Sequence, residues 1–504
     1  MSPSYISPNE ARNLRVYRIT LRGNIMSTLQ ERLKRTKIVA TLGPATDKAE
    51  VLSSMITAGL DVVRLNFSHG TIHAHRQRVQ TIREQAQKAG RPIGIMADLQ
   101  GPKIRIACFK KGVIQLSVAA AFILDAHLDS QAGDETKVGI DYANLPKDLK
   151  LGDRLLLDDG RIVLAVEDVV GSQIHCRVII GGLLSNHKGI NRQGGGLSAD
   201  ALTPKDHADI ATAVELNCDY IAVSFPRHAD DMILARQLVT QHGGTAGLIA
   251  KIERSDALLH LDAIIEASEG VMVARGDLGV EIGEAEVPAV QKHIIQRARA
   301  LNKVVITATQ MMESMIHNPI PTRAEVSDVA NAVLEGTDAV MLSAETATGA
   351  HPVLVVETMA RICRGAEKQP NSRISAHRIE CNFQHPEEAI AMAAMYIANH
   401  HRIKAIIAFT ETGATPLWMS RIRSGIPIYS FTASRLTEHK MTLYRGVYPY
   451  YLDFHTPSAE RMQDTAIDYL KAAQLVQTNN HVLVTYGRVG KQGGTNTLKI
   501  LEVP

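Results

Sequence analysis

Apolar and β-branched residues recur along the chain in short runs, and most runs are followed by a longer stretch of helical periodicity. Eight such runs occupy residues 36–42, 61–67, 92–99, 218–225, 246–252, 270–275, 303–309 and 337–343. Helices are predicted between them at 47–58, 73–89, 204–216, 287–301 and 324–334. Strands that alternate with helices pair in parallel, and eight such units predict a closed (β/α)8 TIM barrel. The strands are mostly apolar, as burial on both faces requires.

The third unit of this pattern is interrupted. About 100 residues separate its strand from the next helix, far more than a loop inside a compact domain contains. The inserted segment has short strand patterns, with a hairpin signal at Asp158-Asp159-Gly160. We therefore expect a barrel catalytic domain at 36–101 and 198–367, with an inserted β-barrel lid domain at 102–197.

A third domain follows, because the pattern pauses after residue 367 and then resumes. A helix at 387–399 and strands at 405–409, 427–431 and 481–486 predict a C-terminal α/β domain over 368–504. Residues 1–35 are expected to be a tail. Its arginines are typical of a transit peptide, and the alternative is that the residues before Met26 come from an upstream start codon. We favour the upstream start, so a chain beginning at Met26 should keep its stability and activity.

Composition excludes several classes of protein. The 504 residues include 55 Lys and Arg against 52 Asp and Glu, a net charge of +3 that does not fit a dedicated nucleic-acid binder. No apolar run reaches the roughly 18 residues that a membrane helix needs. The five cysteines form no CxxC pair, which favours buried thiols and a cytoplasmic location over disulfides or a metal cluster.

Charged residues gather at the ends of the predicted strands, where TIM barrels place their active sites. Arg64, Lys251 and Arg275 are expected on one rim together with Glu253 and Asp277. Two carboxylates with room for water and phosphate oxygens suit Mg²⁺, and cations beside a hard metal suit phosphoryl transfer. The alternative is that Glu253 merely forms an ion pair with Lys251, since residues two apart in a strand point the same way.

Other motifs are weak or absent. The chain has no GxxxxGK[ST] loop, which excludes a P-loop kinase. Gly194-Gly195-Gly196 fits a loose dinucleotide-binding pattern but does not follow a strand in a βαβ unit. His69 and His187 are interpreted as polar contacts, because neither has a second ligand at metal spacing.

Several blocks at these strand ends resemble the pyruvate kinase family, most closely its bacterial type II form. They include RTKIVATLGPAT, VVRLNFSHG, ADLQGPKIR, LSNHKGIN, AVSFPR, AKIER, VMVARGDLGVEI, MMESMIHNPIPTRAEVSDVANAV and GTDAVMLSAETATG. The resemblance extends from about Lys34 to the C terminus. It implies a glycolytic enzyme that transfers the phosphoryl group of phosphoenolpyruvate to ADP, giving pyruvate and ATP.

The matching motifs imply roles for individual residues. Arg64 and Lys251 would contact the moving phosphoryl group, with Lys251 stabilising its transition state. Glu253 and Asp277 would hold Mg²⁺, for which Mn²⁺ can substitute. Gly276 and Asp277 would bind the substrate carboxylate together with Thr309, and Ser343 would take part in the proton relay to the enolate. The nucleotide-contact positions are Arg64, Asn66, His69, Arg105 and Lys188.

One departure from the family pattern concerns potassium. Asn66, Ser68, Asp98 and the Leu99 carbonyl match the family's K⁺ site, but Lys103 stands where K⁺-dependent members have Glu. We expect the Lys103 ammonium to reach the pocket lined by Asn66 and Ser68 and to replace K⁺, or else to point to solvent.

The C-terminal domain resembles the effector-binding domain of the family. Thr410, Thr412, Gly413 and Thr415 match its phosphate-binding loop, and Gly493-Gly494-Thr495-Asn496 is expected to form a second Gly-rich loop. The effector would be a sugar phosphate or AMP, unless both segments are plain turns. The resemblance also implies a homotetramer.

Two other functions stay open at this point. One is a different phosphoenolpyruvate-using barrel enzyme, such as a mutase or aldolase. The other is a catalytically silent binding protein of the same fold. Lys188 and the inserted domain favour a second, nucleotide substrate, and the intact Lys251, Glu253 and Asp277 favour catalysis.

Overall fold

The computed structural model describes residues 33–372, 382–383, 385–453, 459–487 and 494–504. The described chain forms two compact units. The first contains Thr36–Ser372 and Arg435–Arg445, and the second contains the remaining described residues. The expected tail up to residue 32 lies outside the described residues.

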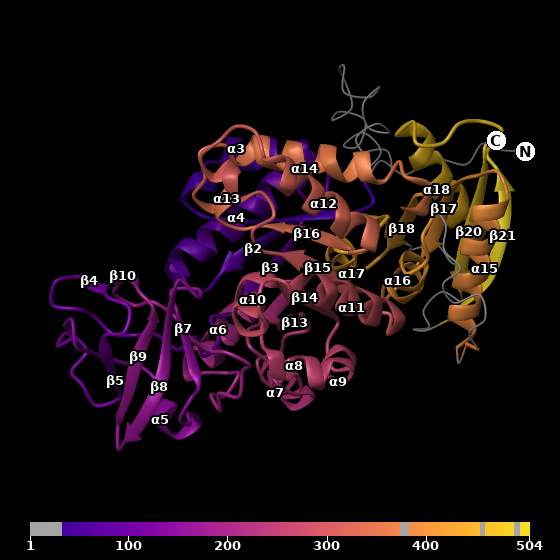
Figure 1. Ribbon diagram of the computed structural model, residues 1–504. Coiled ribbons are helices and arrows are strands. Elements are labelled where there is room, and N and C mark those ends of the chain that lie inside the picture. Colours follow the sequence, from indigo (N-terminus) through magenta and orange to yellow (C-terminus); the bar gives the residue numbers. More distant parts are fainter. Residues whose placement is uncertain (1–32, 373–381, 384, 454–458, 488–493) are drawn as a thin grey trace, which may run out of the picture. The chain divides into compact units, whose positions relative to one another are not determined.

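A closed parallel barrel of eight strands forms the centre of the first unit (Figure 1). Its strands are β1 (Lys37–Thr41), β2 (Val62–Asn66), β3 (Gly94–Asp98), β12 (Tyr220–Val223), β13 (Gly247–Ile252), β14 (Gly270–Ala274), β15 (Val304–Ala308) and β16 (Ala339–Leu342). Each of the eight predicted strands is present, and β1 closes the barrel by pairing with both β2 and β16. The predicted (β/α)8 fold is therefore confirmed.

Helices surround the barrel strands (Figure 1). They are α3 (Ala49–Ala58), α4 (Ile72–Ala89), α6 (Pro204–Glu215), α7 (Ala229–Gln241), α8 (Ser255–Leu259), α9 (Leu261–Glu266), α10 (Arg275–Ile282), α11 (Val287–Ala300), α12 (Arg323–Glu335), α13 (Ala344–Ala347) and α14 (Pro352–Ala366). Short 3₁₀ turns lie at Pro44–Thr46, Glu313–Ile316 and Pro370–Ser372. The five helices predicted from periodicity are all present.

Local signals account for the helix ends. Thr322 begins α12 with a capping box, in which its hydroxyl accepts from the Glu325 backbone while the Glu325 carboxylate accepts from the Thr322 backbone. Gly336 ends the same helix in the left-handed conformation, with φ +102°. The apolar faces of the helices then pack on the strands in one continuous core, which includes Ile38, Val63, Ile95 and Val305.

Close packing at the end of β1 leaves no room for a side chain at Gly43. A Cβ atom there would lie 2.5 Å from the Ala347 carbonyl oxygen, which belongs to the backbone. We predict that Gly43→Ala lowers the free energy of unfolding by about 1–3 kcal/mol, the usual cost of overpacking. Gly365→Ala is the matched control, because nothing lies within 4 Å of that position in α14. It should be slightly stabilising. Calorimetric unfolding checks both, and equal melting temperatures would contradict the prediction.

The inserted segment consists of short strands. These are β4 (Val113–Leu116), β5 (Ala121–Asp125), β6 (Lys137–Gly139), β7 (Arg154–Leu157), β8 (Ile162–Val170), β9 (Gln173–Ile180), β10 (Gly182–Ser185) and β11 (Ile190–Arg192), with the short helix α5 (Leu145–Asp148). Their hydrogen bonds form a six-stranded sheet and a separate two-stranded sheet, β10–β4, rather than one closed barrel. The predicted hairpin joins β7 to β8, and Asp158 and Asp159 adopt positive φ there. The domain boundaries at 102 and 197 stay a prediction.

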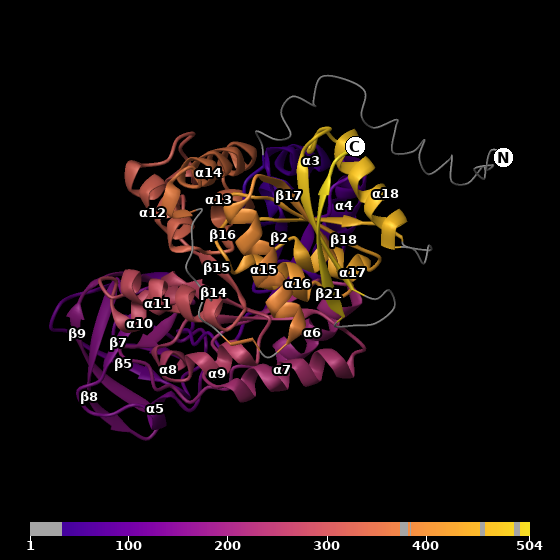
Figure 2. The ribbon, with the colours of Figure 1, turned by 90° about the vertical axis from the view of Figure 1, so that its right-hand side faces the viewer.

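The second unit contains a five-stranded sheet (Figure 2). Its strands are β17 (Ile403–Phe409), β18 (Ile428–Thr432), β19 (Val447–Tyr451), β20 (His481–Gly487) and β21 (Thr495–Glu502), in the order β19-β18-β17-β20-β21. Its helices are α15 (Pro386–His400), α16 (Ala414–Ser420) and α18 (Ala459–Ala472). The three predicted strands and the predicted helix are present, so the C-terminal α/β fold is confirmed.

Two features of this region differ from the expectation. Thr495 and Asn496, expected in a Gly-rich loop, begin strand β21 instead, where Thr495 pairs antiparallel with Gly487 of β20 and Asn496 lies at a register shift. Gly493 lies outside the described residues. Helix α17 (Arg435–Met441) and the residues up to Arg445 belong to the barrel unit. The Tyr220 hydroxyl donates to the Lys440 carbonyl, and the buried Arg445 side chain donates to the Thr337 carbonyl.

Neither a membrane-spanning helix nor a disulfide appears in the part of the chain that the structure describes. None of the described helices is long and apolar enough to cross a bilayer. Cys108, Cys176, Cys218 and Cys363 are free and buried, as predicted for them, and burial raises the pKa of the Cys218 thiol to about 12. Cys381 lies outside the described residues.

Candidate active site

The residues expected at the strand ends lie on one rim of the barrel. Arg64 is in β2 and Asp98 ends β3, while Lys251 is in β13 and Glu253 follows that strand. Gly276 and Asp277 lie in the first turn of α10, directly after β14; Thr309 follows β15 and Ser343 follows β16. Since parallel strands in a closed barrel all end on the same side, these six loops meet there.

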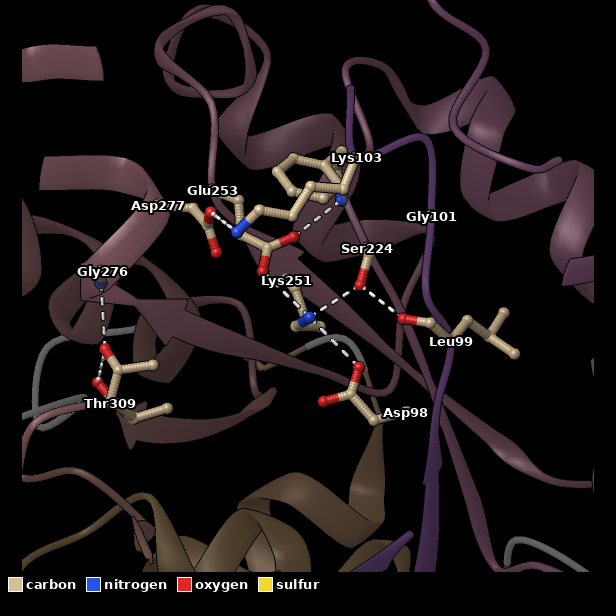
Figure 3. A network of polar contacts seen from close by, with 12 residues as sticks. Asp98, Leu99, Gly101, Lys103, Ser224, Lys251, Glu253, Gly276, Asp277 and Thr309 are labelled. Atoms are coloured by element: carbon tan, nitrogen blue, oxygen red, sulfur yellow. Dashed lines mark hydrogen bonds and ion pairs between the residues drawn. The ribbon is translucent and has the colours of Figure 1, made fainter. Parts of the chain in front are cut away.

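The Lys251 ammonium is at the centre of the rim, buried between two carboxylates (Figure 3). Its Nζ lies 3.1 Å from Asp98 Oδ1 and 2.9 Å from Glu253 Oε1, and it donates to Ser224 Oγ at 2.6 Å. Burial alone would lower the pKa of Lys251, but the Asp98 and Glu253 carboxylates outweigh it and raise that pKa. The side chain therefore stays charged in a place with little water.

Asp98 connects this ammonium to a second cation. Its other carboxylate oxygen accepts from Arg64 Nε, and Arg64 also donates to Thr41 Oγ1 at 3.0 Å. Burial would raise the pKa of Asp98, yet Arg64 and Lys251 together lower it. One buried carboxylate thus orients both cations that are expected at the phosphoryl group.

Glu253 and Asp277 supply two carboxylates beside these cations. Burial raises the pKa of Glu253 to about 7, with Asp277 contributing and Lys251 opposing. Glu253 Oε2 also accepts from the Phe225 backbone at 2.9 Å. The described residues include no group of three or more His, Cys, Asp or Glu that could hold a metal ion. A metal here would therefore need oxygens from water or substrate as well.

Lys103 differs from the sequence expectation. Its Nζ forms an ion pair with Asp277 Oδ1 at 2.9 Å, and neither Asn66 nor Ser68 is its partner (Figure 3). Burial would lower the pKa of Lys103, but Asp277 and then Asp159 and Glu253 raise it. The expected location was wrong because an ammonium is attracted most strongly to the acidic side of the rim, while Asp98 is already occupied by Arg64 and Lys251.

Thr309 is held in a strained backbone conformation. Its φ is +65°, which is rare for a β-branched residue. Arg275 donates to the Thr309 carbonyl at 2.6 Å and to the Ala308 carbonyl at 3.1 Å, and its ion pair with Asp328 fixes the guanidinium. The Gly276 N–H donates to Thr309 Oγ1 at 3.0 Å. The threonine hydroxyl and the first turn of α10 are therefore brought together.

Ser343 is tied to the neighbouring loop through Glu345. The Ser343 backbone donates to Glu345 Oε2 at 2.6 Å, and the Met312 backbone donates to Glu345 Oε1 at 3.2 Å. Burial raises the pKa of Glu345 above its usual range. This carboxyl group links the loop after β16 to the loop after β15, which carries Thr309.

The residues of the expected K⁺ site lie around the ends of β2 and β3. Asn66 and Asp98 are register partners, and Asn66 Oδ1 accepts from the Ser68 backbone at 3.1 Å. The Leu99 carbonyl accepts from Ser224 Oγ at 2.7 Å. The exposed His69 follows this loop, and its carbonyl contacts the ring of the buried His75.

Two of the expected nucleotide contacts come from the inserted segment. Arg105 and Lys188 lie on adjacent antiparallel stretches, because the Ile106 backbone donates to the Lys188 carbonyl at 2.9 Å. Lys188 Nζ forms an ion pair with Asp158 Oδ1 at 2.6 Å. Their cationic groups are thus presented by the segment that interrupts the barrel.

Three residues organise the rim, of which sequence reasoning missed Ser224 and Glu345 and placed Arg275 on the rim without its role. Ser224, Arg275 and Glu345 bind Lys251, Thr309 and Ser343 respectively. All three are in strand-end blocks that were already conspicuous, namely SFPR, ARGD and SAET. The signal was present, but nothing in the sequence indicates which side chain each of them contacts.

The expected effector loop precedes helix α16 in the second unit. Thr410 Oγ1 accepts from the Gly413 backbone at 2.9 Å, and Gly413 has φ +84°. Thr412 Oγ1 accepts from the Ala414 backbone, and the Thr415 and Thr495 hydroxyls share a hydrogen bond of 2.8 Å. The predicted turn into a helix is present.

The fold and the rim together define a TIM-barrel enzyme whose strand ends carry paired cations and carboxylates. The family model described as pyruvate kinase, barrel domain, matches residues 33–356, and that of the pyruvate kinase alpha/beta domain matches residues 388–501. The chain therefore belongs to the pyruvate kinase family, which makes it a glycolytic phosphotransferase.

Individual relatives agree over nearly the whole chain. A pyruvate kinase of Buchnera aphidicola subsp. Schizaphis graminum is 54% identical over 94% of this chain and 99% of its own length. Pyruvate kinase II of Salmonella typhimurium is 52% identical over 94% of this chain and its entire length. The crystal structure of a pyruvate kinase from Cryptosporidium parvum superposes with a TM-score of 0.87 at 33% identity, covering 94% of this chain and 96% of that one.

Proposed function

We propose that the enzyme transfers the phosphoryl group of phosphoenolpyruvate to ADP and then protonates the resulting enolate to give pyruvate. The observation that carries this proposal is the buried Lys251 ammonium between Asp98 and Glu253. A fixed positive charge in a site with little water stabilises a moving phosphoryl group more than it could in water.

The substrate carboxylate is bound at the first turn of α10. Backbone N–H groups in the first turn of a helix have no partner within the helix and favour an anion. The Gly276 and Asp277 N–H groups belong to this turn, and the Gly276 N–H, which donates to Thr309 Oγ1 at 3.0 Å, would turn to the substrate carboxylate when it binds. Phosphoenolpyruvate bound there would direct its phosphoryl group toward Arg64 and Lys251.

Glu253 and Asp277 fit a magnesium ion. Both are hard oxygen donors on neighbouring barrel strand ends, and the Glu253 carboxylate is buried, with 2% of its surface exposed. Two protein carboxylates suffice, since Mg²⁺ usually keeps waters and substrate oxygens. When bound, the ion neutralises charge on phosphoryl oxygens, and Mn²⁺ offers the same chemistry. Lys103, now paired with Asp277, would have to move aside.

The enolate left after transfer must be protonated on carbon. Ser343 supplies the hydroxyl for this proton transfer. Glu345 holds the Ser343 backbone and also binds the loop that carries Thr309. The proton would pass through Ser343, since its backbone is fixed and its side chain is only partly buried at the rim. The nucleotide is contacted by Arg64, Asn66 and His69 of the barrel and by Arg105 and Lys188 of the inserted domain.

The test is a coupled assay for pyruvate. The purified enzyme should form pyruvate from phosphoenolpyruvate only when ADP and Mg²⁺ are present, with ATP in equal amounts. Pyruvate without ADP would indicate a different phosphoenolpyruvate-using enzyme. No turnover at all would indicate a silent binding protein of the same fold.

Potassium dependence follows from the charge at Lys103. We predict that the wild type works well in Na⁺ or Tris buffer, because a tethered ammonium supplies a positive charge at the rim. Lys103→Glu should make the enzyme need K⁺, since it places a third carboxylate beside Asp277 and Glu253. Initial rates of both proteins, measured as a function of K⁺ concentration at constant ionic strength, test this prediction. A wild type that is inactive without K⁺, with the same K⁺ response in the variant, would contradict this.

The second unit is proposed to bind a phosphorylated effector, either a sugar phosphate or AMP. The hydroxyls of Thr410, Thr412 and Thr415 and the turn at Gly413 support this, because they surround the start of α16. For assembly and location, the proposal is a homotetramer in the cytoplasm. Sedimentation with and without each candidate effector tests the assembly.

A further inference from the structure

A short antiparallel ribbon connects the barrel to the inserted domain. Arg105 and Gly189 form an isolated antiparallel β-bridge. Beside it, the Ile106 N–H donates to the Lys188 carbonyl at 2.9 Å, and the His187 N–H donates to the Ala107 carbonyl at 3.3 Å. The two proposed nucleotide cations of the inserted domain, Arg105 and Lys188, therefore depend on the geometry of this one ribbon.

His187 has an unusual backbone conformation in this ribbon. Its φ is +59°, in the left-handed region that residues with a Cβ atom seldom adopt. The conformation matters because the His187 carbonyl accepts from Arg105 Nη1 at 3.0 Å. If residue 187 relaxed to an ordinary φ, its carbonyl would turn away from Arg105, and the adjoining Lys188 would turn with it.

A thiol–imidazole contact accompanies this conformation. Cys108 Sγ and His187 Nε2 share a hydrogen bond of 3.2 Å. Cys108 is buried in the inserted domain with 7% of its surface exposed, whereas His187 is exposed. The backbone on both sides of Cys108 is anchored as well, since its N–H donates to the Ser130 carbonyl and its carbonyl accepts from Gly133. A fixed thiol thus holds an exposed ring.

We propose that Cys108 and His187 form a positioning pair for the nucleoside diphosphate. The pair acts through Arg105 and Lys188 and does not itself touch the nucleotide. Cys108 anchors the His187 ring, the ring keeps residue 187 left-handed, and the His187 carbonyl then orients the Arg105 guanidinium. The inference rests on the proposed function, because it deepens how the inserted domain recognises ADP.

The test measures the affinity for MgADP by calorimetry and the KM values for ADP and phosphoenolpyruvate. Cys108→Ala and His187→Ala should each weaken ADP binding about three- to tenfold, the range expected for one lost hydrogen bond. The KM for phosphoenolpyruvate should stay within about twofold, because the rim residues that bind it are untouched. His187→Gly should recover most of the ADP affinity, since glycine adopts a positive φ without steric cost.

Cys176→Ala is the matched control. Cys176 is also a buried free thiol of the inserted domain, on β9, but its thiol donates to the Ile174 carbonyl. It should leave ADP affinity unchanged. The proposal is overturned if Cys108→Ala and His187→Ala bind ADP like the wild type, if both substrates weaken equally, or if Cys176→Ala causes the same loss. Should Cys108→Ala fail to fold, His187→Ala decides, because that ring is exposed.

Failure of this inference is distinguishable from failure of the proposed function. A wild type that forms pyruvate from ADP, with unchanged ADP affinity in the variants, overturns the positioning pair alone. A wild type that forms no pyruvate overturns the proposed function. In that case, the ratio of variant to wild-type ADP affinity, measured by calorimetry, still decides whether the pair positions the nucleotide. A wild type that binds no MgADP overturns the positioning proposal as well.

Discussion

Replacing Lys251 by methionine should reduce kcat by a factor of about 10²–10³ or more, while the protein still folds. Preorganised charges aimed at a developing anion are worth about this much in enzymes. Methionine has a similar volume but no charge, so Asp98 would keep Arg64 as its partner and Glu253 would lose its nearest cation. Steady-state kinetics at saturating substrates measure the loss, and calorimetry checks the fold.

Lys111→Met provides the control for Lys251→Met. It removes an exposed ion pair, 2.6 Å between Lys111 Nζ and Glu135 Oε1, in the inserted domain. That variant should keep wild-type turnover. If Lys251→Met were folded and retained a turnover near that of Lys111→Met, Lys251 would have no part in the transfer step.

Glu253→Gln and Asp277→Asn should each raise the Mg²⁺ concentration needed for half-maximal activity by at least about tenfold. A small hard cation gives up water only to ligands that carry charge, and each amide removes one of only two carboxylates. The shapes of the side chains are unchanged, so packing at the rim is kept. Direct titration with Mn²⁺ in the absence of substrates should show the same loss of affinity, independently of turnover.

Glu335→Gln is the matched control for the metal variants. Glu335 is a partly buried carboxylate of the same barrel, but it is the last residue of α12 and accepts from Gln291 in α11. Its Mg²⁺ and Mn²⁺ titrations should follow the wild type. Unchanged titrations in both Glu253→Gln and Asp277→Asn would mean that the metal is held elsewhere.

The strands and the rim could be predicted because their signals are local. A run such as 303–309 has Val304, Val305 and Ile306 in succession without polar alternation, which is typical of a strand buried on both faces. Once eight such runs are counted, barrel closure places their ends on one side, so Arg64, Lys251 and Asp277 must meet. No knowledge of packing is needed for that conclusion.

Elements with weak local patterns were found only in the structure. Helix α17 lies in the sequence among the strands of the C-terminal domain, yet it belongs to the barrel unit, where the Tyr220 hydroxyl donates to the Lys440 carbonyl of this helix. Arg445, which follows the helix, donates to the Thr337 carbonyl. Strand β21 was expected to begin as a loop. Its pairing with β20 determines its conformation, and pairing between distant segments leaves no periodic trace in the chain.

The sequence by itself thus determined the barrel, the interruption by a β-rich segment and the set of charged residues at the rim, since each depends on residue type and spacing. Only the tertiary structure decided which partner each charge takes. Lys103 pairs with Asp277 rather than reaching Asn66, and Cys108 meets His187 across 79 positions of sequence. Such pairings depend on differences in burial and distance of a few ångströms, which arise only when the chain is folded.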